Sequence, residues 1–189
     1  MNKAVKGNYG YINTKRKLVI LRTILFFAIS LALFAAGILT THTRRNLLTV
    51  VAVLGALPSC KSLVNMIIFI RAKGCSDSAY KQIKEAEGHL IGMYDMYFTS
   101  YQKNYALSHM VVEDHIILGF TEDIKCDLSG CRDHLETMLK QAGFKDMTIT
   151  ITNELSKYCD QLSNLNEKNQ DCDAARDDEI RIALYDISL

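Results

Sequence analysis

Two cysteines and a histidine in the second half of the chain have types and a spacing that could support chemistry. Cys126 and Cys131 are separated by four residues, and His134 follows Cys131 after two more. A thiolate beside an imidazole is the arrangement of a cysteine nucleophile, and the same atoms are zinc ligands. An enzymatic or ligand-sensing role therefore has Cys126, Cys131 and His134 as its candidate residues.

Neither the zinc site nor the cysteine nucleophile has all the residues that it requires at a recognisable spacing. A structural zinc site needs four ligands, and although Cys159 could add one, no CxxC pair accompanies the three candidates. The histidines of this region are numerous enough to fall near a cysteine by chance: His89, His109, His115 and His134. We interpret His109 and His115 as ordinary strand residues. The sequence thus predicts no metal and no cofactor, and it leaves open whether the chain is an enzyme.

Familiar phosphate-binding and catalytic motifs are missing from the sequence. It contains no GxxxxGK[ST], GxGxxG, GxSxG or HExxH pattern. A nuclease of the restriction-endonuclease type would need an acid and a lysine on the third predicted strand, and the segment 115–120 has neither. The acidic balance of this region also repels a phosphate backbone, so we expect no nucleic-acid partner.

The charges that surround these residues divide the chain in two. Residues 1–76 contain no Asp or Glu but eleven Lys and Arg, whereas residues 77–189 contain all 21 acids and the other eleven bases, a net charge of −10. Such asymmetry indicates two different environments.

The basic part holds two long apolar runs, Leu18 to Thr41 and Leu47 to Ile70. Each is long enough to cross the ~30 Å hydrocarbon core as a helix, and neither has the repeating polar face of a soluble helix. We expect a transmembrane hairpin over residues 18–73, with the lipid bilayer as its first partner, between a basic segment 1–17 and an acidic domain 77–189. Buried soluble helices, or a cleaved signal peptide for the first run, are the alternatives.

Basic residues flank the hairpin on both outer sides and are fewer in its connection. Lys and Arg concentrate on the cytoplasmic side of membrane helices. We therefore expect a two-pass protein of the cell membrane with both termini cytoplasmic, although Arg44 and Arg45 in the connection count against this orientation.

Three polar side chains within the runs have no acid nearby: Arg22, Lys61 and Asn65. Lys61 either snorkels to the headgroups or contacts a second chain, and Asn65 one turn later could hydrogen-bond between helices. These residues are the predicted polar contacts of the membrane part. Pro58 predicts a local kink or unwinding of the second helix.

The acidic part predicts an α+β domain with the order α-β-β-β-α-β-α-β and a mixed sheet. The expected helices are 77–87, 127–141 and 155–165, and the expected strands are 93–100, 105–112, 115–121, 147–152 and 180–187. Short breaks between the first three strands favour an antiparallel meander. Residues 166–178 read as a polar loop.

The segment Gly10-Tyr11-Ile12 with the following basic run, and the stretch Ala56 to Ser62, resemble uncharacterised two-span membrane proteins of low-GC Gram-positive bacteria over residues 10–70. The resemblance implies a bacterial origin, carries no known active site and adds nothing about mechanism. Two hypotheses follow from the sequence as a whole. The first is a membrane-anchored interaction or scaffold protein that binds a protein partner or forms a homo-oligomer at the inner membrane face. The alternative is a membrane-associated enzyme or ligand sensor that uses the Cys and His residues; transport through an oligomeric hairpin is a further possibility.

Overall fold

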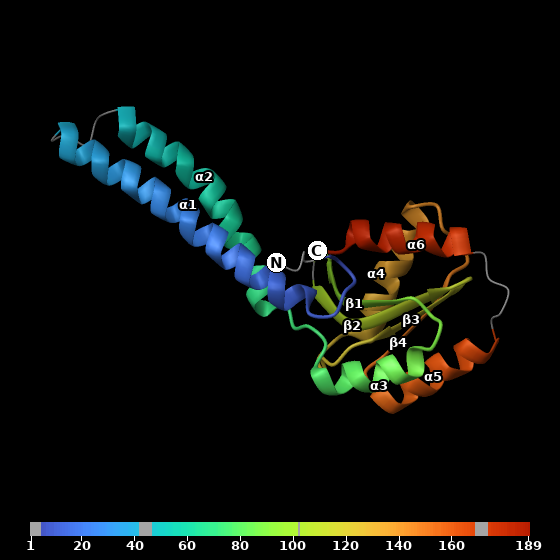
Figure 1. Ribbon diagram of the computed structural model, residues 1–189. Helices are drawn as coiled ribbons and strands as arrows, with labels where there is room; N and C mark the ends of the chain where they lie inside the picture. Colours follow the sequence, from blue (N-terminus) through green and yellow to red (C-terminus); the bar gives the residue numbers. More distant parts are fainter. Residues whose placement is uncertain (1–4, 42–46, 102, 169–173) are drawn as a thin grey trace. The chain divides into compact units, whose positions relative to one another are not determined.

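The computed structural model describes residues 5–41, 47–101, 103–168 and 174–189 (Figure 1). Its contacts divide the chain into two compact units. One is the helix pair Ile12–Ala72, and the other joins the segment that ends at Tyr11 to residues Lys73–Leu189. Each unit is described by itself below.

Two long helices form the first unit, α1 (Tyr11–Thr41) and α2 (Leu47–Arg71). Both are long and apolar enough to cross a membrane. Their large side chains are mostly exposed, as at Leu21 (66%), Leu31 (69%) and Leu57 (68%). A soluble core helix would bury such residues against the rest of its domain. The exposed apolar surface therefore agrees with the predicted hairpin, and α1 begins seven residues before the predicted run.

Small and hydroxyl side chains join the two helices. The Thr23 and Ser62 hydroxyls lie 2.8 Å apart, and both side chains are buried. A Cβ added to Gly55 would lie 3.1 Å from the Ser30 Oγ, so the absence of a side chain allows α2 to approach α1 closely. Close approach at small residues with hydrogen bonds between helices is typical of membrane helix pairs.

Pro58 lies inside α2, which continues as one helix from Leu47 to Arg71. A proline removes one backbone N–H from the helix ladder. The next residue contributes an additional bond, since the Ser59 hydroxyl donates to the Gly55 carbonyl at 3.0 Å. The unwinding that Pro58 suggested is thus not present in α2.

The second unit contains the elements α3 (Asp77–Glu87), β1 (Gly92–Thr99), β2 (Asn104–Glu113), β3 (Ile116–Phe120), α4 (Leu128–Gln141), β4 (Thr148–Thr152), α5 (Leu155–Lys168) and α6 (Ala174–Ile187). The order from α3 to α5 is the predicted one. The meander and the mixed sheet are confirmed, because β1, β2 and β3 pair antiparallel and β3 pairs parallel with β4.

The last predicted element is wrong. Residues 180–187 were expected to form a strand, but they belong to helix α6. The buried positions Ile180 and Leu184 are four residues apart, whereas Ile182 between them is 59% exposed. This is the period of a helix rather than of a strand. The predicted loop 166–178 is also too long, since α5 extends to Lys168 and α6 begins at Ala174; residues 169–173 lie outside the described residues.

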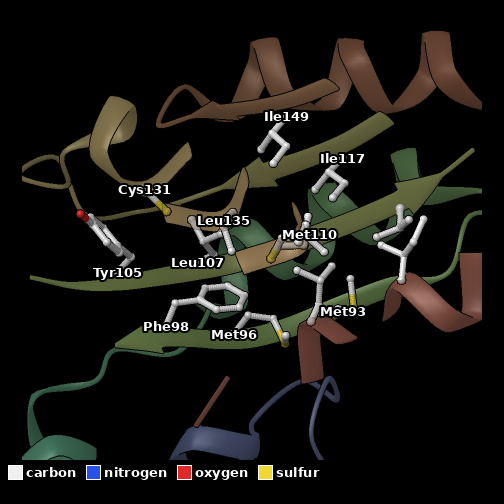
Figure 2. Close-up of a cluster of buried hydrophobic side chains, with 14 residues drawn as sticks. Met93, Met96, Phe98, Tyr105, Leu107, Met110, Ile117, Cys131, Leu135 and Ile149 are labelled. Carbon is white, nitrogen blue, oxygen red and sulfur yellow. The ribbon is translucent and has the colours of Figure 1, made fainter. Parts of the chain in front are cut away.

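The sheet has the strand order β1-β2-β3-β4 and is covered on both faces. Helices α4 and α6 lie on one face, and α3 and α5 lie on the other (Figure 1). Each face has its own apolar core. The first core contains Met93, Met96, Phe98, Leu107, Met110, Cys131, Leu135, Ile180 and Leu184, among others (Figure 2). The second core contains Ala79, Ile83, Tyr94, Val111, Phe120, Tyr158 and Leu162, among others.

The segment before α1 and the residues after α6 both meet the outer edge of β1. The Tyr94 amide donates to the Gly7 carbonyl at 2.7 Å, and the Leu189 amide donates to the Tyr97 carbonyl at 2.9 Å. The Lys6 ammonium donates to the carbonyl of Ser188 at 2.8 Å. The segment before α1 is therefore part of the α+β unit, which the sequence did not indicate. It covers backbone groups that an open strand edge would leave unpaired.

Candidate functional site

A cleft of about 490 Å³ lies beside the β1 edge. Its lining comes from the N-terminal segment, from α3, and from the turn into β1: Gly7, Asn8, Tyr9, Tyr80, Lys84, Glu87, Leu90, Ile91, Gly92 and Tyr94. All of these residues belong to the α+β unit.

Helix α3 brings its charged residues to the cleft on one side. Ser76 caps its first turn, and its Oγ accepts a bond from the Ala79 amide at 3.2 Å. Tyr80, Lys84 and Glu87 follow one another at intervals of four and three residues, so they share one face. The buried residue Ile83 holds the neighbouring face on the second core.

The C-terminal end of α3 is fixed by α5. Gly88 has φ +57°, a conformation that favours glycine. The Asn166 side chain donates to the carbonyls of Ala86 (3.4 Å) and Glu87 (3.2 Å) and accepts from the His89 amide (3.3 Å). Terminal carbonyls that the helix leaves unpaired are thereby satisfied. Glu87 consequently occupies a defined position at the bottom of the cleft.

The Glu87 carboxylate is nearly enclosed, with 3% of its side chain exposed. Its Oε2 accepts bonds from the Lys84 ammonium at 2.7 Å and from the Tyr94 hydroxyl at 3.1 Å. Its Oε1 faces the His109 Nε2 at 3.7 Å, beyond hydrogen-bond distance. Burial alone would raise the pKa of Glu87, but His109 and Lys84 together outweigh it and lower that pKa to about 2. Glu87 is therefore ionised at neutral pH.

His109 lies behind Glu87 and is fully buried. Its Nδ1 lies 2.7 Å from the Tyr158 hydroxyl, and its Nε2 has no hydrogen-bond partner among the described residues. Burial lowers the pKa of His109, so the ring is neutral at pH 7. Because an ionised Glu87 faces Nε2, electrostatics favour the tautomer with its proton on Nε2. The Tyr158 hydroxyl then donates to Nδ1.

Gly92 provides the space in which Glu87 and His109 approach each other. A Cβ at this position would lie 2.0 Å from the Glu87 Oε1 and 2.2 Å from the His109 Nε2. Real Cβ atoms do not occur at such distances, so any side chain at residue 92 must displace one of the two groups.

Three tyrosine rings form the remaining wall. Tyr9 stacks on Tyr80 with ring centres 4.0 Å apart, and Tyr94 meets Tyr80 at 5.2 Å with its ring inclined by 62°. The Tyr9 hydroxyl also donates to Asp77 at the start of α3. These contacts attach the N-terminal segment to α3 through aromatic faces.

This arrangement is suited to binding. Neither His109 nor Tyr158 has exposed surface with which to touch a substrate. Glu87 stays ionised far below neutral pH, which makes it a poor general acid. The cleft is lined by one carboxylate, one ammonium and aromatic rings, which supply charge and hydrogen bonds for recognition.

The residues that the sequence proposed lie elsewhere, around the first core. Cys131 is fully buried there (Figure 2), and Cys126 packs against the same cluster. The Cys131 thiol lowers the pKa of Cys126, while Cys126 and burial raise the pKa of Cys131. The structure therefore brings the two cysteines together. The His134 ring packs against the Tyr105 ring, with the ring centres 5.8 Å apart. Within the described ranges, no group of three or more His, Cys, Asp or Glu side chains is placed to hold a metal ion.

Two of the three polar residues predicted as membrane contacts are exposed. Arg22 and Lys61 are exposed on α1 and α2, and Asn65 is half-buried. These positions leave both interpretations of Lys61 open, the snorkelling side chain and the contact with a second chain.

The sequence did not predict the cleft, because its residues are scattered along the chain. In addition, the alternation of side chains between the two faces of the sheet is interrupted in β2. Leu107 and Met110 both face the first core, although strict alternation would place them on opposite faces. Opposite this point, Asp95 of β1 has φ +56°, an unusual conformation inside a strand. With this interruption of the alternation, the His109 side chain lies on the face of the sheet that α5 and Tyr158 cover. The one local signal was the pairing of Lys84 with Glu87 three residues later.

Comparison with known proteins gives no relative for this chain: no family model, no curated protein and no solved structure matches it. The resemblance to two-span proteins of Gram-positive bacteria consequently stays a prediction.

Proposed function

We propose that this chain is a membrane-anchored interaction protein, in which α1 and α2 cross the membrane and hold an acidic α+β domain at its inner face. The observation that carries the proposal is the hydrogen bond from the Tyr94 amide to the Gly7 carbonyl. It joins the segment before α1 to the unit that follows α2. Since both flanks of the helix pair enter one folded domain, both lie on the same side of a membrane, and the domain is held at two points.

The basic residues next to the helix pair support a location of the α+β domain at the inner face of the membrane. Lys15, Arg16 and Lys17 lie in the first turns of α1, and Arg71 and Lys73 lie at and just after the end of α2. Arginine and lysine at these positions favour the cytoplasmic side. The opposite connection, with Arg44 and Arg45, lies outside the described residues.

The charge of the domain supports a protein partner with a basic surface. Residues 77–189 carry a net charge of −10, and such a field favours and accelerates association with cations while it repels nucleic acid. The exposed apolar surface of α1 and α2 supports a second possibility for assembly, a homo-oligomer within the bilayer.

A second candidate function is a ligand sensor, which the cleft favours. Tyr9 lines the cleft and lies two residues before α1 begins at Tyr11. A ligand that moves Tyr9 would therefore act directly on the start of a membrane helix. This version of the sensor uses Glu87 and the tyrosines instead of Cys126, Cys131 and His134.

Cysteine labelling in intact cells tests the anchoring. The variants are Leu47→Cys, at the exposed start of α2, and Ser163→Cys, at an exposed position of α5. A membrane-impermeant maleimide should add one label to Leu47→Cys relative to the unsubstituted chain, and should label Ser163→Cys only after the cells are permeabilised. Labelling of Ser163→Cys in sealed cells would overturn the orientation.

Salt-dependent assembly tests the interaction role. Membranes dissolved in a non-ionic detergent at low ionic strength should release the chain in a complex larger than one copy. Because exposed ion pairs are screened over ~10 Å at 0.1 M salt and over less at higher salt, a complex with a basic partner should dissociate as salt is raised. Migration as a single copy under every condition would contradict the proposal.

A further inference from the structure

We propose that the cleft beside β1 binds a small organic cation, whose ammonium group takes the place of Lys84 on the Glu87 carboxylate and lies against the tyrosine rings. The proposal names the ligand class for the sensor role above and rests on that role. It follows from the charge balance at Glu87, the exposure of Lys84 and the chemistry of the wall.

The first step is the charge at the bottom of the cleft. Glu87 is ionised and nearly enclosed, and the protein supplies a single ammonium to it at hydrogen-bond distance among the described residues, that of Lys84. His109 faces the other oxygen but is neutral and 3.7 Å away. A buried carboxylate without a cation is costly, so Glu87 requires a positive charge from the direction of the cleft.

The second step is that Lys84 can be replaced. Its side chain is 59% exposed, whereas that of Glu87 is 3% exposed. Exchange of Lys84 for a ligand ammonium leaves the buried carboxylate paired with one cation throughout, so no unpaired charge is created. On release, the Lys84 ammonium enters water with no loss of hydration. A ligand cation can therefore take over Glu87 at small cost.

The third step is the affinity of the tyrosine rings in the cleft wall for cations. The negative faces of tyrosine rings attract ammonium and quaternary ammonium groups, and Tyr9, Tyr80 and Tyr94 line the cleft together with Glu87. Asp77, which accepts from the Tyr9 hydroxyl, adds a second acid near the rim. The volume of about 490 Å³ fits a small molecule.

An anion is the opposing possibility, since Lys84 also lines the cleft. It would have to separate Lys84 from Glu87 and leave a buried carboxylate beside a second negative charge. The net charge of −10 over residues 77–189 opposes it further. The two possibilities predict opposite effects for the removal of Lys84.

The experiment titrates the full chain in dodecyl maltoside with n-butylammonium, tetramethylammonium and butyrate, and follows the Gly92 and Tyr94 amide signals by NMR. Both cations should give saturable shifts, and butyrate should give none. Lys84→Ala should tighten cation binding by at least about fivefold, because the ligand no longer competes with a lysine whose partner Glu87 is buried. Lys81→Ala, one turn earlier and exposed, is the matched control and should leave the Kd unchanged.

Removal of the carboxylate gives the second arm. Glu87→Gln should weaken cation binding at least ~10-fold, as expected for the loss of a buried charge partner, and the exposed Glu85→Gln is its control. The proposal is overturned if no cation gives a saturable shift, if Lys84→Ala weakens binding, or if butyrate binds and loses affinity in Lys84→Ala. Since Lys84 is exposed, its variant gives a result even if Glu87→Gln fails to fold. None of these outcomes affects the labelling test of membrane anchoring.

Discussion

Substitution of Gly92 by alanine should destabilise the α+β domain, because the added methyl group has no room. It would lie 2.0 Å from the Glu87 Oε1 and 2.2 Å from the His109 Nε2. Neither group can move freely. Glu87 is held by Lys84 and Tyr94, and the His109 ring is held by Tyr158.

The magnitude follows from the cost of overpacking. Forced shifts in a packed interior cost about 1–3 kcal/mol, and a domain of this size loses roughly 4 °C of melting temperature per kcal/mol. We therefore expect Gly92→Ala to melt about 4–12 °C below the wild type. The assay is thermal unfolding in detergent followed by tyrosine fluorescence. The chain has no Trp, and all nine tyrosines belong to the α+β unit.

Gly119→Ala is the matched control. A Cβ at this position of β3 would meet Ile151 and Leu107 at 3.5 Å, an ordinary van der Waals distance. Replacement of a glycine at an unstrained position changes stability by less than about 1 kcal/mol, and often upward. If Gly92→Ala were as stable as Gly119→Ala, the close approach of Glu87 and His109 would be refuted.

Three further changes test other parts of the account. Tyr158→Phe removes the hydroxyl that pairs with the His109 Nδ1 at 2.7 Å and should cost about 1–3 kcal/mol in urea unfolding; an unchanged midpoint would show that the pair contributes nothing. Burial holds the folded-state pKa of His109 below its ordinary value of 6.5, so the stability that depends on the neutral ring is complete above pH 6.5 and is lost as the pH falls through that value. His109→Phe should accordingly flatten the decrease in unfolding free energy between about pH 7 and 5, and an identical slope in both proteins would count against a neutral His109. Lys61→Leu should insert at least as well as the wild type, because a lysine within a membrane helix costs about 2.5–3.5 kcal/mol; a smaller carbonate-resistant fraction would show that Lys61 assists insertion.

Local patterns predicted most of the elements. The expected helix 127–141 is one of them, and in the structure Asp127 caps the first turn of α4 while Gly143 follows its end with φ +98°. The apolar runs and the β1-β2-β3 meander followed in the same way from uninterrupted hydrophobicity and short polar breaks. Helix α6 was missed because Ile180, Ile182 and Leu184 fit alternation as well as they fit a helix, and only burial by α4 and β2 decides between them.

The cleft could not be predicted in this way. Its wall combines Tyr9 with residues 71 or more positions later in the chain, and its buried support comes from β2 and α5. Strand alternation counted from Leu107 would place His109 in the first core, and the interruption of that alternation, opposite Asp95 with its φ of +56°, has no sequence signal. The site depends on long-range packing, and its one local signal, the Lys84–Glu87 pair on α3, looks the same in the sequence as an ordinary exposed pair.

Hydrogen exchange at the Tyr94 amide, in the full chain in detergent, tests the central claim most directly. That claim is that both flanks of the helix pair build one domain. The Tyr94 amide points out of the sheet and donates to the Gly7 carbonyl at 2.7 Å, so it is protected only if the N-terminal segment is in place. We predict that it exchanges as slowly as the amides bonded between β1 and β2. Exchange at the rate of an unstructured amide, while those β1–β2 amides stay protected, would contradict the account.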